Sequence, residues 1–319
     1  RFHWERVEAS RNFANKIWNA SRFVMMNLED FEPGNIVEKH LGLKDKWILK
    51  RINTITRDVT EALEKFEIGV AAQKIYDFFW SEFCDWYIEM AKTDLYGEDE
   101  VAKKNTQQVL WQVLDHALKL LHPFMPFITE EIWQHIPHDG KSIMLSTWPK
   151  FKPEWDFGDA QDMETVMEAI RGIRNIRAEM NVPLGKKAKA FARVSDSHTK
   201  DVLKQNIDII YSLAKVSEMV FDDDISKISK QAVSCVIKGA EIFIPMEELV
   251  DIDVEIERLN KEKTNLQKEI KRASGKLANK GFVEKAPKEV VEKEQEKLEN
   301  YKDMLEKVEQ RLVMMAELK

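Results

Sequence analysis

The chain has few cysteines and no long apolar run. Cys84 and Cys235 are its two cysteines, and neither belongs to a CxxC pair, so we expect no disulfide framework and no zinc cluster. No segment approaches the roughly 18 apolar residues that a membrane-spanning helix needs. These absences favour a protein of the reducing cytoplasm without membrane contact. The chain begins at Arg1 without an initiator methionine, and we expect it to be part of something longer.

Motifs for catalysis and phosphate binding are also missing. Neither GxGxxG nor GxxxxGK[ST] occurs. His135 and His138 are separated by Pro137, which breaks the helical face that a pair of metal ligands would need. Glu130 and Glu131 suit the start of a helix, where the backbone dipole stabilises carboxylates. The sequence therefore predicts no catalytic residue, no metal site and no cofactor within this chain.

The charge is unevenly distributed. The net charge of −7 argues against general affinity for nucleic acid. Residues 171–193 nevertheless carry seven bases against one acid, and residues 258–288 carry ten bases against three acids. Such islands are either solvated surfaces or local sites for phosphate, and the sequence alone leaves both interpretations open.

Composition and periodicity divide the chain into three parts. All nine tryptophans and twelve of the sixteen phenylalanines precede residue 158, which places the large aromatic core in residues 1–157. Apolar spacing there predicts a helix bundle, and residues 158–250 mix helical and alternating patterns typical of a small α+β module. The helices expected in the bundle span residues 4–29, 35–64, 68–95, 99–122 and 126–135. We expect a strand at 188–194 and a hairpin of 233–237 with 241–245 around Gly239.

Residues 251–319 show two heptad seams. One runs from Ile252 to Leu277 and the other from Val291 to Met315, with positions that alternate by three and four residues. These positions are apolar except for Lys263 in the first seam and Glu294 in the second. Gly275 near the end of the first seam, and Gly281 and Pro287 between the two seams, suit a turn. This pattern predicts an antiparallel coiled-coil hairpin with arms roughly 40 Å long. The fold class is thus mainly α, and the basic tip favours an arm that reaches for phosphate, with self-association as the alternative.

The first helix carries two stripes on opposite sides. Ile17, Val24 and neighbours at helical spacing form an ordinary core face. The opposite stripe consists of Asn12, Lys16, Asn19 and Phe23. An aromatic ring can stack on an unpaired base, an amide can bind a base edge and an ammonium can meet phosphate, which suits single-stranded RNA. The alternative is that Phe23 packs against another helix and the polar residues are solvated.

Several segments resemble class I aminoacyl-tRNA synthetases. Residues 75–89 (IYDFFWSEFCDWYIE) and 120–133 (LLHPFMPFITEEIW) are similar to the anticodon-binding domain of the valine, isoleucine and leucine enzymes. Residues 6–23 (RVEASRNFANKIWNASRF), 175–183 (NIRAEMNVP) and 276–287 (KLANKGFVEKAP) resemble the bacterial valine family in particular. The isoleucine enzymes typically end in a cysteine-rich zinc module, which two isolated cysteines cannot make.

This resemblance implies the function of a larger protein. The family joins valine to its tRNA with ATP and magnesium on a domain with HIGH and KMSKS signatures, and it hydrolyses mischarged tRNA in a separate editing domain. Neither signature occurs here. We therefore expect the C-terminal portion of such an enzyme, inactive alone, whose partners are valine tRNA and the N-terminal catalytic and editing domains. We expect it to be monomeric.

The resemblance also assigns roles to individual residues. By position, Lys16, Asn19 and Phe23 would grip the anticodon bases, with Asn12 and Arg22 beside them. The hairpin would brace the outer corner of the tRNA through Arg272, Lys276 and Lys280. Further contacts to the tRNA backbone would come from Arg171, Arg174 and Arg177, which could instead hold the hairpin to the bundle. Two alternatives stay open: the equivalent tail of a sister synthetase, and a structural coiled-coil module.

Overall fold

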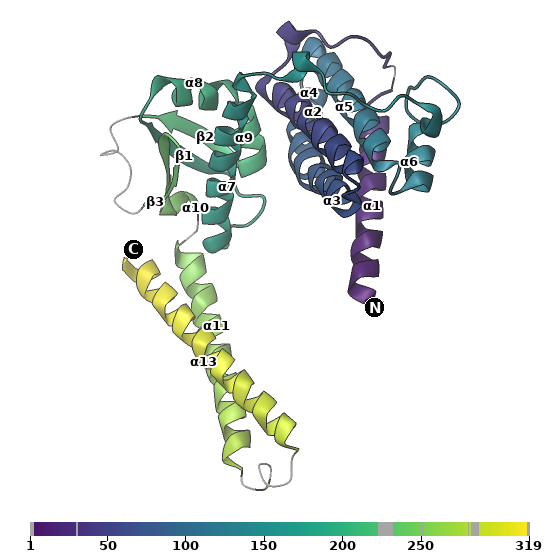
Figure 1. Cartoon of the computed structure of the whole chain (residues 1–319). Helices are drawn as coiled ribbons and strands as arrows, with labels where there is room; N and C mark the ends of the chain where they lie inside the picture. The colour runs from purple at the N-terminus through teal and green to yellow at the C-terminus, as the bar shows by residue number, and fades with distance from the viewer. Residues whose placement is uncertain are drawn as a thin grey trace. The chain divides into compact units, whose positions relative to one another are not determined.

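The computed structural model of this chain describes residues 3–29, 31–222, 232–249, 252–279, 281 and 287–317. By their internal contacts the residues form two compact units. The first consists of Arg1–Arg171, Ser195–Ala214 and Ile237–Gly239, and the second of Gly172–Val194, Lys215–Val236 and Ala240–Lys319. The expected mainly α architecture is confirmed (Figure 1). The division into residues 1–157, 158–250 and 251–319 stays a prediction.

The first unit is a bundle of amphipathic helices. Its core is formed by aliphatic side chains of α2, such as Ile48, Leu49 and Ile52, and by Phe78, Phe79 and their aromatic neighbours, which are completely buried. Its helices are α1 (Trp4–Met26), α2 (Leu43–Glu64), α3 (Ile68–Asp77), α4 (Ile88–Leu95), α5 (Glu100–Leu121), α6 (Pro126–Trp133), the start of α7 (Met163–Glu179), α8 (Ser197–Gln205) and α9 (Ile207–Ala214). None of the helices in the described part of the chain is long and apolar enough to cross a membrane.

The helix expected at 68–95 has an unusual middle. It runs without interruption through α3, η2 (Phe78–Tyr87) and α4, but η2 is a π-helix of ten residues. The wider turn of a π-helix changes which side chains share a face, and such segments occur frequently at functional sites. Here η2 contacts α1.

The helix expected at 35–64 begins later than the sequence predicted. Residues 35–42 contain only a short 3-10 turn, η1 (Glu38–His40), and α2 starts at Leu43. Gly42 precedes the helix in an extended conformation, and the carboxylate of Asp45 accepts a hydrogen bond of 3.0 Å from its backbone N–H. This cap satisfies a free donor at the helix start, so the prediction for 35–42 was wrong.

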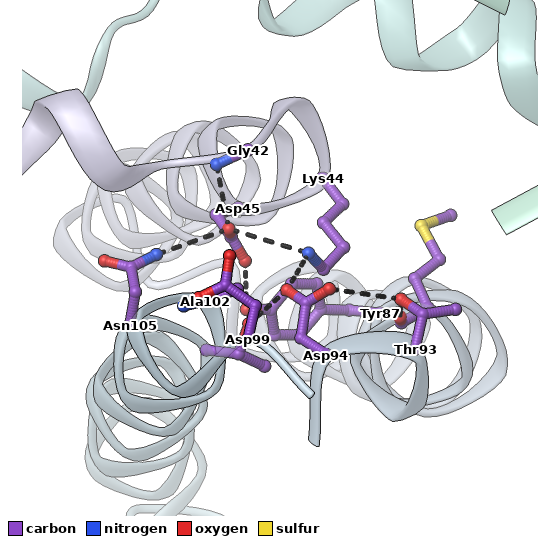
Figure 2. A network of polar contacts seen from close by, with 11 residues as sticks. Gly42, Lys44, Asp45, Tyr87, Thr93, Asp94, Asp99, Ala102 and Asn105 are labelled. Carbon is purple, nitrogen blue, oxygen red and sulfur yellow. Dashed lines mark hydrogen bonds and ion pairs between the residues drawn. The ribbon is translucent and has the colours of Figure 1, made fainter. Parts of the chain in front are cut away.

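A buried polar network joins the beginning of α2 to η2, α4 and α5 (Figure 2). The Tyr87 hydroxyl donates a hydrogen bond of 2.7 Å to Asp45, and Lys44 forms an ion pair with Asp94. Thr106 of α5 donates a further bond of 2.7 Å to Asp94. Burial raises the pKa of the Asp45 carboxyl, with Lys44 and Tyr87 opposing this shift. All of these residues except the half-buried Asp94 are buried, so their polar groups depend on one another for hydrogen bonds. The network therefore fixes how the four elements meet.

The second unit contains a small mixed sheet. Its strands are β1 (Ala188–Val194), β2 (Val216–Phe221), β3 (Ala232–Ile237) and β4 (Ala240–Pro245), in the order β2-β1-β4-β3. β1 pairs with β2 in parallel and with β4 antiparallel, where Phe191 lies opposite Phe243. Gly239 has a φ of +81° in the turn before β4, a conformation that glycine adopts without strain. The expected strand at 188–194 and the hairpin around Gly239 are confirmed.

After α10 (Met246–Leu249), the second unit continues as a helical hairpin. α11 (Ile252–Ala278) and α13 (Lys288–Glu317) lie side by side (Figure 1). Leu259, Leu266 and Ala273 of the predicted seam are buried against α13. The ion pairs Lys263–Glu309 and Lys276–Glu294 cross between the helices at 2.9 Å each, so the helices are antiparallel as the heptads predicted. Lys263, the seam's polar residue, keeps its ammonium at the edge in this way.

Candidate nucleic-acid interface

The two stripes of α1 lie in different environments. Ile17, Ser21 and Val24 of the core stripe are buried. Asn12 and Asn19 of the opposite stripe are exposed. Phe23 is half-buried, so it belongs neither to the core nor to open solvent. Part of the Phe23 ring is therefore accessible from the surface of α1.

The opposite stripe forms one wall of a groove. The groove has a volume of about 510 Å³, and Asn12, Lys16, Asn19 and Phe23 all line it, together with Asn15. Arg22 is exposed and is not part of the lining. The structure thus brings four of the five predicted base-binding residues together on one surface.

The other wall comes from η2 and α4. It consists of Trp80, Cys84, Asp85, Ile88, Glu89 and Lys92. In an α-helix, Trp80 and Asp85 would be rotated about 140° from each other, and the π-helical turn brings them to the same side. Burial raises the pKa of the Cys84 thiol to about 12, so this residue is a neutral thiol near physiological pH.

Each lysine in the groove is held by a carboxylate and lies over an aromatic ring. The Nζ atom of Lys16 is 2.5 Å from Oδ1 of Asp85 and 4.0 Å from the centre of the Trp80 ring. On the other side, Nζ of Lys92 is 2.7 Å from Oε1 of Glu89. Amides, aromatic faces and paired charges therefore line the groove, a combination that suits the faces and edges of unpaired bases.

The three arginines of α7, which belong to the first basic island, have different environments. The guanidinium of Arg171 lies 5.0 Å from the centre of the Trp86 ring and 3.9 Å from a Glu164 carboxylate oxygen. Arg174 is exposed on the same helix. Both side chains reach the surface of their helix, where a phosphate could approach them.

Arg177 lies inside the fold and is only 7% exposed. Its Nη2 atom donates a hydrogen bond of 3.1 Å to the Pro183 carbonyl, and burial lowers the pKa of the guanidinium. Asn181, in the turn between them, has a φ of +51°. This geometry favours the interpretation that Arg177 stabilises the turn after α7. A contact between Arg177 and phosphate is less compatible with its burial.

The basic residues predicted on the hairpin tip are partly paired. Arg272 and Lys276 are both exposed on α11. Arg272 lies 3.7 Å from Glu269, and Lys276 lies 2.9 Å from Glu294 of α13. Lys280 lies outside the described residues. The expected phosphate contacts of this tip therefore involve cations that already have acidic neighbours.

Among the described residues, no group of histidine, cysteine, aspartate and glutamate has the arrangement of a metal site. Sequence reasoning missed the second wall of the groove, above all Trp80, Asp85 and Lys92. In the sequence, the aromatic segment 75–89 indicates a function only through its family resemblance, because a π-helical turn has no signal in hydrophobic periodicity.

Comparisons with known proteins agree with this architecture. The family described as the anticodon-binding domain of tRNA ligase matches residues 45–192, and the valyl tRNA synthetase tRNA binding arm matches residues 251–316. The class of protein is therefore that of the tRNA ligases, and the second match concerns the hairpin itself.

Individual relatives give a finer assignment. The chain is 49% identical to a valine–tRNA ligase of Clostridium acetobutylicum over 318 residues, which are 98% of this chain and 36% of the relative. It is 50% identical to the Clostridium perfringens enzyme, over 97% of this chain and 35% of that one, and 45% identical to the Bacillus subtilis enzyme, over 100% and 36%. The chain belongs to the valine–tRNA ligase family and corresponds to its C-terminal region. It spans about 36% of the length of these relatives.

Proposed function

We propose that this chain binds valine tRNA and recognises its anticodon loop in the groove between α1 and η2–α4. The observation that carries the proposal is that Asn12, Lys16, Asn19 and Phe23, selected from sequence, line a single groove. An unstacked anticodon base would lie on Phe23, and the Asn19 amide would bind a base edge. Lys16 would meet a phosphate of the loop.

The hairpin supplies a second contact, far along the chain from the groove residues. α11 and its tip carry Arg272, Lys276 and Lys280, and these would bind the outer corner of the tRNA through its phosphates. Arg171 and Arg174 would add contacts to the backbone, while Arg177 holds its own turn. Contacts of this kind fix the orientation of the tRNA and contribute no sequence discrimination.

The whole protein would attach valine to this tRNA. ATP, magnesium and the reacting groups would be held by the catalytic domain, and the editing domain would hydrolyse wrong products. The residues of this chain would contribute by orientation, because holding the tRNA at several points fixes its acceptor end relative to the active site. We further propose that the protein is a monomer of the cytoplasm.

Exchange of the anticodon tests this function. The affinity of this chain is measured for valine tRNA, for isoleucine tRNA and for each tRNA carrying the anticodon of the other. We expect the valine anticodon to improve binding in both tRNA bodies. A preference for the isoleucine anticodon would assign the chain to a sister enzyme, and equal binding of all four would contradict recognition of the anticodon.

Sedimentation without RNA tests the alternative structural role. A monomer at all concentrations agrees with a tRNA-binding arm. A concentration-dependent dimer that is joined through residues 252–318 would favour a coiled coil used for self-association.

A further inference from the structure

Trp80 lies in the groove under a lysine that another residue holds in place. The indole contacts Tyr76, whose ring centre is 5.7 Å away at an interplanar angle of 19°, and also Phe13 at 6.3 Å and 25°. These neighbours fix its orientation. Lys16 lies over its ring at 4.0 Å, and Asp85 holds the Lys16 ammonium at 2.5 Å. An aromatic ring that its neighbours hold in place thus has the flexible side chain of Lys16 over one face.

The cover is easy to displace. The side chains of Lys16 and Asp85 are 23% and 52% exposed, and ion pairs in contact with water contribute little stability. A phosphate group offers Lys16 a partner equivalent to the carboxylate. When Lys16 turns to such a partner, the face of Trp80 that it covers becomes accessible from the groove.

We propose that Trp80 is a second stacking surface for an unpaired base and that the Lys16–Asp85 pair covers it in the RNA-free protein. This inference rests on the proposed function, in which the groove receives the anticodon loop. On binding, Lys16 exchanges Asp85 for a phosphate of the loop, and a base takes its place on Trp80. The groove then holds two bases on two rings, Phe23 from α1 and Trp80 from η2.

Two carboxylates, on the same wall of the groove as Trp80, determine which groups of the RNA can lie beside the Trp80 ring. Asp85 and Glu89 disfavour a phosphate deep in the groove and accept hydrogen bonds from N–H groups. The loop would therefore enter with its bases inward and its phosphates toward the outer ends of the lysines. This arrangement makes Asp85 a positioning residue, which keeps Lys16 over Trp80 until RNA arrives.

Fluorescent base substitution tests the stacking surface. Valine tRNA is made with 2-aminopurine at one anticodon-loop position at a time, and its quenching by this chain is measured together with affinity. We expect Trp80→Leu to weaken binding by about fivefold or more and to remove the quenching at one position. Phe23→Ala should remove it at a different position. Trp80→Phe keeps an aromatic face and should retain most of the quenching.

The cover is tested independently by Asp85→Asn. Without the carboxylate Lys16 is free to meet phosphate, so we expect binding to tighten by about two- to fivefold. Asp58→Asn is the matched control, because it removes the same charge from an ion pair with Lys74 whose residues do not line the groove. It should change affinity less than Asp85→Asn. Weaker binding by Asp85→Asn would overturn the covering role.

The results separate this inference from the proposed function. If Asn19→Ala and Phe23→Ala weaken binding while Trp80→Leu binds and quenches like the unmodified chain, Trp80 is not a stacking surface and the groove still recognises RNA. If none of these changes affects affinity, the proposed function itself fails. Should Trp80→Leu not fold, the unmodified chain still decides: if it quenches 2-aminopurine at one loop position only, and Phe23→Ala removes that quenching, there is no second stacking surface and the proposal is overturned.

Discussion

The ammonium of Lys92 on α4 lies 5.5 Å from the centre of the Phe23 ring on α1. A cation–π contact therefore joins the two walls of the groove. This contact explains how Phe23 is half-buried without belonging to the core. A cation–π contact at an exposed site contributes only about 0.5–1 kcal/mol, so a ligand that stacks on the ring can displace the cation. The position of Phe23 therefore suits a ring that receives a ligand.

Replacing Phe23 by alanine tests its proposed role. We expect a loss of about 1–3 kcal/mol in the binding of valine tRNA, because the alanine cannot stack on a base. Affinity is measured by titration at fixed ionic strength. Phe66→Ala is the matched control, since Phe66 is 87% exposed and does not line the groove, and it should bind normally. Unchanged affinity of Phe23→Ala would assign Phe23 to packing alone.

Replacing Arg272, Lys276 and Lys280 together by alanine tests the hairpin. We expect weaker binding of valine tRNA and a shallower dependence of affinity on salt, because fewer counterions are released from the RNA. The preference for the valine anticodon should not change. Affinity is measured between 50 mM and 200 mM salt, a range chosen to reveal the slope.

The hairpin offers its own control for this prediction. Lys293, Lys302 and Lys307 are exposed on α13, and replacing them by alanine removes the same charge from the other helix. That variant should keep a steeper salt dependence than the tip variant. An unchanged slope for the tip variant would mean that the tip does not contact phosphate.

Replacing Lys44 by alanine tests the network at the start of α2. We expect a loss of about 3–5 kcal/mol in the free energy of unfolding, because Asp45 and Asp94 then face each other without the buried ammonium. Urea denaturation measures this change. Lys46→Ala breaks a pair with Asp159 that is much more exposed, and it should lose at most about 1 kcal/mol. Equal losses in the two variants would contradict the structural role of the network.

Regular periodicity carried most of what the sequence predicted. The heptads of α11 and α13 and the two stripes of α1 depend on spacing along one helix, which a sequence displays directly. The second wall of the groove depends on a π-helical turn that rotates Asp85 toward Trp80, and apolar spacing does not report such a turn. Likewise, Arg177 sits in a basic run, and only the turn around Asn181 encloses its guanidinium.

His116 gives the protein a predicted sensitivity to acid. Burial in α5, together with the charge of Lys152, lowers the pKa of its imidazole to about 4, below the ordinary value of 6.5. Between these two pH values the unfolded chain binds a proton at His116 that the folded chain does not. The free energy of unfolding should therefore fall as the pH drops, by up to about 3 kcal/mol.

Urea denaturation at pH 7.5 and pH 4.5 measures this loss for the unmodified chain and for His116→Gln. The variant should lose less stability on acidification, whereas His135→Gln, which changes an exposed histidine, should lose as much as the unmodified chain. Identical pH dependence of all three proteins would show that His116 binds its proton equally well in the folded and unfolded states.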